Sequence, residues 1–201
     1  YFLMYGALNP LDKHIRLQGG AQLRSQNASN TILGPVLLPG GLASILTDVH
    51  LTLANEVSGA GSLEKSGTNT LYLNSANTFT GTLLVTNGAL TATHPGALGA
   101  NRLVTVRYGT VTGGSGTRLG LAGNIVTPAS VAAHFITTTN GGDFRTSLIS
   151  EAGSNVWTGP VWLTGDALVN FNAGLTATLG VTGPLLASNS FTATAFFRGG
   201  T

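Results

Sequence analysis

Asn77-Thr-Phe-Thr-Gly81-Thr-Leu-Leu-Val85 is the stretch that decides the fold, because the chain repeats its form twice more. The form is Asn, any residue, an apolar residue, any residue and Gly, and an apolar strand follows it. It returns at Asn30-Thr-Ile-Leu-Gly34 and at Asn155-Val-Trp-Thr-Gly159. In each copy a second turn and a second apolar strand come next, so the repeating unit is strand, turn, strand, turn. Internal repeats of such a short unit are typical of solenoid proteins.

Short runs of alternating apolar residues fill much of the remaining chain. Thr70-Leu-Tyr-Leu-Asn74 and Leu103-Val-Thr-Val-Arg107 are two of them, and Gly or Asn closes most such runs. A period of two, interrupted by turn residues roughly every 8 to 12 positions, indicates many short strands. Residues 128–135 are the only candidate for a turn or two of helix. We therefore expect an all-β protein.

The composition favours the same fold class. Of the 201 residues, 29 are Gly and only 8% are charged, against about 25% charged in an average domain. Thr, Asn and Ser occupy the polar positions in place of Glu, Lys and Arg, and they suit strands and turns better than helices. Because 42% of the residues are hydrophobic, the chain can still fill the core of several coils.

We predict a right-handed parallel β-helix that covers residues 1–201 as a single segment. Each coil would pair its backbone with the next coil and stack its inward apolar side chains into ladders. Coils of about 20 to 25 residues would give roughly eight or nine coils. We expect Gly and Asn at the corners because they tolerate positive φ. The predicted turn positions are Asn30, Gly34, Asn77, Gly81, Asn155 and Gly159.

Residues 57–99 carry a longer motif. It begins Val57-Ser-Gly-Ala-Gly-Ser-Leu-Glu-Lys-Ser-Gly67, passes through the turn at Asn77 and continues into Gly88-Ala-Leu90. This stretch resembles the autotransporter-associated β-strand repeat, with its Gly-x-Gly-x-Leu-x-Lys strand, Asn-Thr-aromatic-x-Gly turn and Gly-x-Leu strand. One full copy spans residues 57–99. The segments that begin at Asn30 and Asn155, 125 positions apart (155 minus 30), resemble the spacer coils between such copies.

The resemblance implies a β-helix stalk in a secreted bacterial surface protein, and it brings no catalytic residues with it. We therefore expect an extracellular or cell-surface structural scaffold, stalk or fibre subunit, and no enzyme activity. Adhesion and end-to-end assembly into filaments are further expectations. The alternative function is that of a carbohydrate-binding or carbohydrate-cleaving β-helix.

The titratable residues give little support to a catalytic or metal site. Cleavage of glycans needs clustered carboxylates, and Glu56 and Glu64 are the closest pair that could lie on neighbouring strands. The histidines lie 36, 44 and 40 positions apart, so no two share the short spacing of usual metal-ligand pairs. These histidines are His14, His50, His94 and His134. We expect no catalytic residues, no metal and no cofactor.

Charge and hydropathy argue against two classes of partner. The 9 Lys and Arg residues are scattered singly, so we expect no nucleic-acid partner. Pro, Gly, Asp and His interrupt the most apolar stretch, residues 33–54, so we expect no membrane span. Surface glycans remain a candidate partner if aromatic side chains point outward, although aromatic residues at strand positions more often pack inside. The aromatic residues in question are Tyr72, Phe79, Trp157 and Trp162.

Both ends of the sequence are apolar, whereas a solenoid usually closes with polar caps. The expectation is either continuation into further coils of a longer chain or end-to-end self-association of subunits. The candidate contact residues are Tyr1, Phe2 and Leu3 at one end and Phe191, Phe196 and Phe197 at the other.

Overall fold

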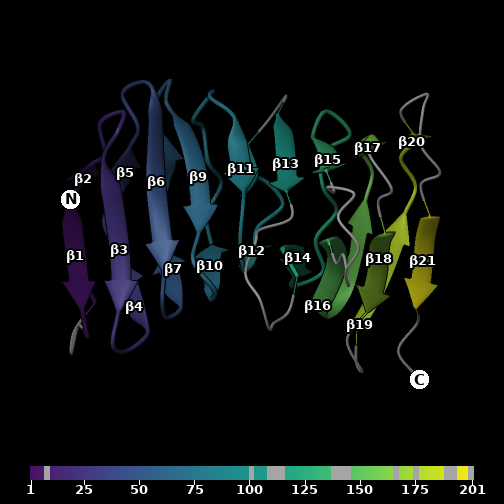
Figure 1. The fold of residues 1–201 in the computed structure, drawn as a ribbon, viewed down its shortest axis with the longest axis horizontal. Helices are drawn as coiled ribbons and strands as arrows, with labels where there is room; N and C mark the ends of the chain where they lie inside the picture. Colours follow the sequence, from purple (N-terminus) through teal and green to yellow (C-terminus); the bar gives the residue numbers. More distant parts are fainter. Residues whose placement is uncertain are drawn as a thin grey trace.

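The structure is a computed structural model that describes residues 1–6, 10–99, 102–107, 116–136, 146–164, 168–173, 177–187 and 194–198. Within these ranges the only helical or strand elements are β-strands, and every strand pair is parallel. The strands follow one another in a row of coils from the N-terminus to the C-terminus (Figure 1). The predicted all-β fold, a parallel β-helix, is confirmed.

Sheet A takes one strand from each successive coil and has nine strands in the described part of the chain. In sheet order they are β1 (Phe2–Tyr5), β3 (Gln22–Gln26), β6 (Leu42–Thr47), β9 (Ser62–Ser66), β11 (Leu83–Val85), β13 (Leu103–Arg107), β15 (Ala132–Ile136), β17 (Val161–Thr164) and β20 (Leu185–Ala187).

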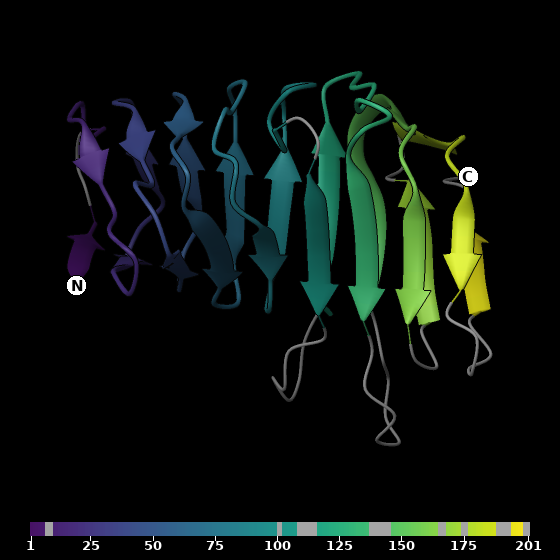
Figure 2. The same cartoon turned by 90° about the horizontal axis from the view of Figure 1, so that it is seen from above.

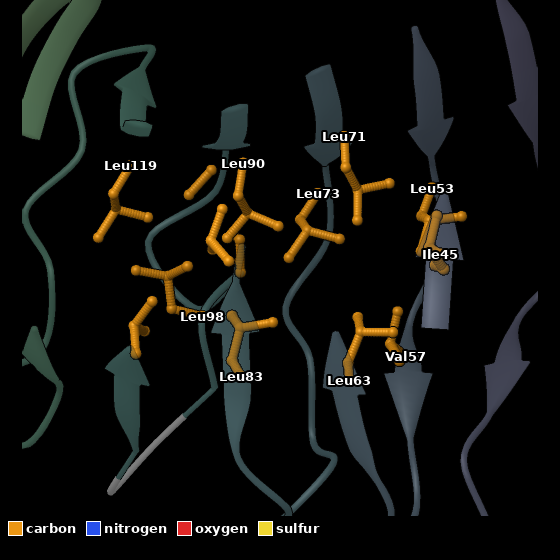
Figure 3. Packing of buried hydrophobic residues seen from close by; sticks show 14 of the residues in the cluster. Ile45, Leu53, Val57, Leu63, Leu71, Leu73, Leu83, Leu90, Leu98 and Leu119 are labelled. Atoms are coloured by element: carbon orange, nitrogen blue, oxygen red, sulfur yellow. The ribbon is translucent and has the colours of Figure 1, made fainter. Parts of the chain in front are cut away.

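Sheet B lies across the core from sheet A (Figures 2 and 3). Its strands are β4 (Asn30–Ile32), β7 (Leu51–Leu53), β10 (Thr70–Leu73), β12 (Ala89–Ala92), β14 (Arg118–Ala122), β16 (Thr146–Trp157), β18 (Leu168–Ala173) and β21 (Thr194–Arg198), and β19 (Ala177–Val181) pairs with the second half of β16. A short third sheet joins β2 (Ile15–Arg16), β5 (Val36–Leu37) and β8 (Val57–Ser58) in the first coils.

The register gives the length of each coil. Leu63 pairs with Leu83, 20 positions later, within the predicted range. Towards the C-terminus the coils lengthen, because Val104 pairs with Ala133, 29 positions later. The extra residues enter between strands and leave the sheet A register intact. The nine strands of sheet A are close to the eight or nine coils predicted.

Alternation along each strand turns one set of side chains into the core. In β9, Leu63 is completely buried, whereas Ser62 and Glu64 are partly exposed. Register then stacks the inward residues into columns, and Figure 3 shows the two sets meeting between the sheets. Burying one Leu side chain contributes about 1.5–3 kcal/mol. The columns include Ala43, Leu63, Leu83 and Val104 in sheet A and Leu51, Leu71, Leu90, Leu119 and Leu148 in sheet B.

Residues 128–135 contain a turn rather than helix. The Val131 N–H donates to the Pro128 carbonyl at 3.0 Å, and the chain then enters β15. In the described ranges, no helix has the length and apolar character needed to cross a membrane.

Candidate functional site

The predicted turn residue Asn77 lies buried at a corner, where its amide links three successive coils. Its Oδ1 accepts a hydrogen bond from the Val57 N–H of the previous coil at 2.7 Å. Its Nδ2 donates to the Ala97 carbonyl of the next coil at 2.5 Å. The side chain therefore satisfies backbone groups on both sides that the strands leave unpaired at the bend.

Asn155 repeats this clamp, because its Oδ1 accepts a hydrogen bond from the Ile125 N–H of the previous coil at 2.7 Å. Asn30 lies at a different place, at the start of β4 in sheet B, but shares one local contact with Asn155. The Nδ2 of Asn155 donates to Ser150 Oγ at 2.7 Å, and the Nδ2 of Asn30 donates to Ser25 Oγ at 2.8 Å. Both Ser residues precede their Asn by five positions. The first and third copies of the sequence repeat thus make the same local contact, and all three Asn residues are buried.

The predicted turn glycines are required for a different reason from the one expected. Gly34, Gly81 and Gly159 do not have positive φ. Instead, a Cβ on Gly81 would lie 2.2 Å from the Gly61 carbonyl oxygen, and a Cβ on Gly159 would lie 1.7 Å from that of Val131. Only glycine allows adjacent coils to approach this closely. Positive φ does occur at the second turn of the unit, at Gly88.

Lys65 is an inward residue that the sequence reasoning missed. Its side chain is completely buried, and its in-register neighbours are Ile45 and Val85. The Nζ donates to the Ser66 and Gly67 carbonyls at 2.9 Å each and to the Asn87 carbonyl of the next coil at 2.8 Å. The amine therefore ties together the turns of two coils from inside.

Two opposing effects act on the Lys65 amine. Burial lowers the pKa of Lys65 to about 7, because the charged form loses its water. The three carbonyl oxygens favour the ammonium form, which has three N–H donors. The sequence does contain a sign of this burial. Lys65 lies two positions after Leu63 in β9, so both side chains point to the same, inward side of the strand.

Glu56 and Glu64, the closest acidic pair in the sequence analysis, have separate partners. Glu56 accepts a short hydrogen bond from Thr78 Oγ1, and Glu64 accepts one from Thr86 Oγ1 at 3.2 Å. Each contact joins a Glu to a Thr of the next coil on the outer surface. The two carboxylates thus serve as links between coils.

The histidines are also distributed singly. His50 and His94 accept hydrogen bonds through Nδ1 from the backbone N–H groups of Thr70 and Gly96, at 3.3 and 3.0 Å. His134 contacts Thr164 instead, with 2.7 Å between Nε2 and Oγ1. Among the described residues, no three His, Cys, Asp or Glu side chains gather where they could hold a metal ion.

The four aromatic residues considered for glycan binding divide into two groups. Phe79 and Trp157 are fully buried. Tyr72 is partly exposed on sheet B, with its ring centroid 5.9 Å from that of His50. Trp162 is 45% exposed on the outer face of sheet A. The structure therefore does not bring the four together into one stripe.

The N-terminal contact candidates lie in or beside β1, the first strand of sheet A in the described part of the chain. Tyr1, Phe2 and Leu3 are 73%, 41% and 43% exposed. A cavity of about 320 Å³ opens there, between apolar side chains and a basic rim. Its lining residues are Phe2, Leu11, Lys13, His14, Ile15, Arg16 and Leu17.

The candidates at the other end are only partly described. The backbone of Phe196 and Phe197 belongs to β21, which pairs with β18. Phe191 lies outside the described residues.

Comparison of the chain with models of protein families, with curated proteins and with solved structures found no match.

Proposed function

We propose that the chain is an extracellular structural scaffold, a stalk or fibre segment of a bacterial cell surface or matrix. The observation that carries the proposal is the continuous pairing of nine parallel strands along the axis in sheet A. Each coil is held to the next by backbone hydrogen bonds and by a shared apolar core, so the protein extends by adding equivalent layers. Such an architecture suits a rod that projects or connects.

The clamps at the corners support the same role. Asn77 and Lys65 tie neighbouring coils from within, where water does not compete for their hydrogen bonds. Both belong to the motif over residues 57–99 that resembles the autotransporter-associated repeat. Their structural use supports a relationship to that family and, with it, secretion to the bacterial surface.

End-to-end assembly is part of the proposal. The exposed apolar residues at the N-terminal end and the cavity beside them are of the kind that another coil would cover. Among the described residues, β1 pairs only with β3, so its other edge can accept a parallel strand. The proposed occupant of this edge is another coil, either from a second copy of the chain or from the continuation of a longer chain.

Location in the native host tests the scaffold function. Antibodies raised against the folded chain should label intact cells of the producing bacterium, or the matrix around them. The control is an antibody against a cytoplasmic protein of the same cells, which should label them only after lysis. Labelling by the first antibody that also requires lysis would contradict an extracellular scaffold.

A further inference from the structure

The outer face of sheet A mixes polar and apolar side chains along the solenoid, and in the first coils β6 presents Leu42 and Leu46. In β3 and β9 every outward side chain is polar or charged. From β13 onward apolar and hydrogen-bonding side chains share the face, and Arg107 is the only charged group among those described in β13, β15, β17 and β20. The four strands are neighbours in the sheet (Figure 1).

Trp162 lies on β17, between β15 and β20. Register places Thr105, His134, Trp162 and Leu186 in one line on successive coils, at a spacing of about 4.8 Å. Buried Val161 and Leu163 flank Trp162 in β17, so the indole points away from the core. Leu103, which is 40% exposed, lies on the same face.

The polar groups around the indole suit a neutral ligand. His134 lies in the adjacent strand, and its contact with Thr164 orients the imidazole. Burial lowers the pKa of His134, which favours the neutral form of the ring. Arg107 by itself cannot neutralise the several phosphates of a nucleic acid.

We propose that this face binds a neutral carbohydrate chain, with the Trp162 indole stacked on a sugar ring. The exposed indole offers a flat apolar surface with a polar N–H, which matches a sugar ring that is apolar on its face and polar at its rim. His134 lies on the adjacent coil, Thr105 and Arg107 lie on the coil beyond it, and all three can hydrogen-bond with hydroxyl groups of an extended ligand. This site goes beyond the scaffold role and does not depend on end-to-end assembly.

The shape of the face favours an extended glycan over a folded protein. A stable protein interface buries about 800 Å² on each partner, with a well-packed apolar centre. Here one exposed aromatic side chain lies on the outer face of the sheet, and hydrogen-bonding groups alternate with the aliphatic residues around it. A sugar chain can follow the line of coils and meet an equivalent strand at every step.

Tryptophan fluorescence and calorimetry test the site directly. The chain has two tryptophans, of which Trp157 is fully buried and Trp162 is exposed. Titration with a panel of neutral hexasaccharides, made of α- and β-linked glucose, β-linked mannose and β-linked N-acetylglucosamine, should quench or shift the Trp162 emission. We expect at least one of them to bind with a Kd below about 1 mM.

Matched variants separate the site from the rest of the surface. Trp162→Ala should weaken binding at least about tenfold, while Trp162→Phe should retain part of it. Tyr72→Ala, which removes an outward aromatic residue from sheet B, should bind as the wild type does. Circular dichroism checks that each variant keeps its β-sheet spectrum.

Three results would overturn the proposal. The first is the absence of saturable binding to every sugar of the panel at concentrations up to about 10 mM. The second is equal affinity of Trp162→Ala and wild type. The third is a change in Trp162 emission that follows protein concentration without sugar, since this would identify the face as a contact between copies of the chain.

Discussion

Lys65 places a basic side chain where the neighbouring coils have Ile45 and Val85. A buried cation is costly unless its donors are satisfied, and here three turn carbonyls satisfy them. Strand alternation predicts an inward side chain at this position. The partners could not be predicted, because they are backbone groups of two different turns that only the coil geometry brings together.

The stability of the protein should depend on the ionisation of Lys65. Its pKa in the folded state is about 7, below the unfolded value of about 10.4. Between these values the unfolded chain holds one more proton, so the free energy of unfolding should rise with pH, by at most about 1.4 kcal/mol per pH unit. Below about pH 7 both states are protonated and this contribution stays constant. Lys65→Met should remove the dependence.

Urea unfolding followed by circular dichroism, from about pH 6 to about pH 9.5, measures the free energy of unfolding of the wild type and of Lys65→Met at each pH. Lys13→Met is the matched control, because Lys13 is exposed. A constant difference in unfolding free energy between wild type and Lys65→Met across the range would contradict a lowered pKa. It would mean that the three carbonyls keep the ammonium charged.

At the scale of elements, the repeated Asn-x-apolar-x-Gly form does not mark one kind of position. Asn77 and Gly81 lie in the bend between β10 and β11, whereas Asn30 begins β4 and Asn155 lies within β16. Conformational freedom at positive φ does not explain the glycines of this form. The requirement arises between coils, at the approach of Gly81 to the Gly61 carbonyl, and a single copy of the motif contains no information about its neighbour.

A pair of alanine substitutions distinguishes close approach from general loss of a glycine. Gly81→Ala should lower the free energy of unfolding by about 2 kcal/mol or more, because the new Cβ overlaps the Gly61 carbonyl oxygen. Gly40 has no atom within 4 Å of such a Cβ and does not have positive φ. Gly40→Ala should therefore be neutral or stabilising by about 0.4–1 kcal/mol. Equal effects in chemical denaturation would contradict the explanation.

The two tryptophans show how far the alternation along a strand predicts whether a side chain points into the core or outward. Both lie in the third copy of the repeat, and the composition does not indicate that one is buried and the other exposed. Alternation within Val161-Trp162-Leu163 places Trp162 outward once Val161 is known to be buried. The direction of Trp157 depends on the path of the long strand β16, which pairs with β14, β18 and β19 and is interrupted by a bulge.

At the scale of the whole molecule, the repeat predicted stacked coils and parallel pairing, and both follow from the need to pair each strand with its copy in the next coil. The length of the later coils could not be predicted. The residues that separate Val104 from Ala133 break the short period without disturbing the register. A solenoid tolerates residues added between strands because they do not change the pairing of the strands themselves.

End-to-end assembly makes a prediction about the intact protein. Purified wild-type chain should form oligomers or filaments that grow with concentration in size-exclusion chromatography and electron microscopy. Phe2→Lys should suppress them, because a charge at the mouth of the end cavity opposes burial. Leu42→Lys changes a residue of similar exposure on β6, away from the end, and should assemble normally.

A wild-type protein that stays monomeric at about 100 μM would exclude stacking of copies. Suppression by Leu42→Lys as strongly as by Phe2→Lys would show that association uses the side of the solenoid instead of its end.

Ser25 binds Asn30 and Ser150 binds Asn155 within the chain's own coils, so these contacts do not fix the number of coils. The length of the protein can therefore change in steps of one coil. Each coil advances the axis by about 4.8 Å. The Ser25–Asn30 contact lies between β3 and β4, and the Ser150–Asn155 contact lies within β16, so the same side-chain pair serves two different places in a coil. Duplicating or deleting one 20-residue layer would change the distance between the two ends by that step, with the neighbouring layers unchanged. Gene duplication can therefore set how far such a rod extends.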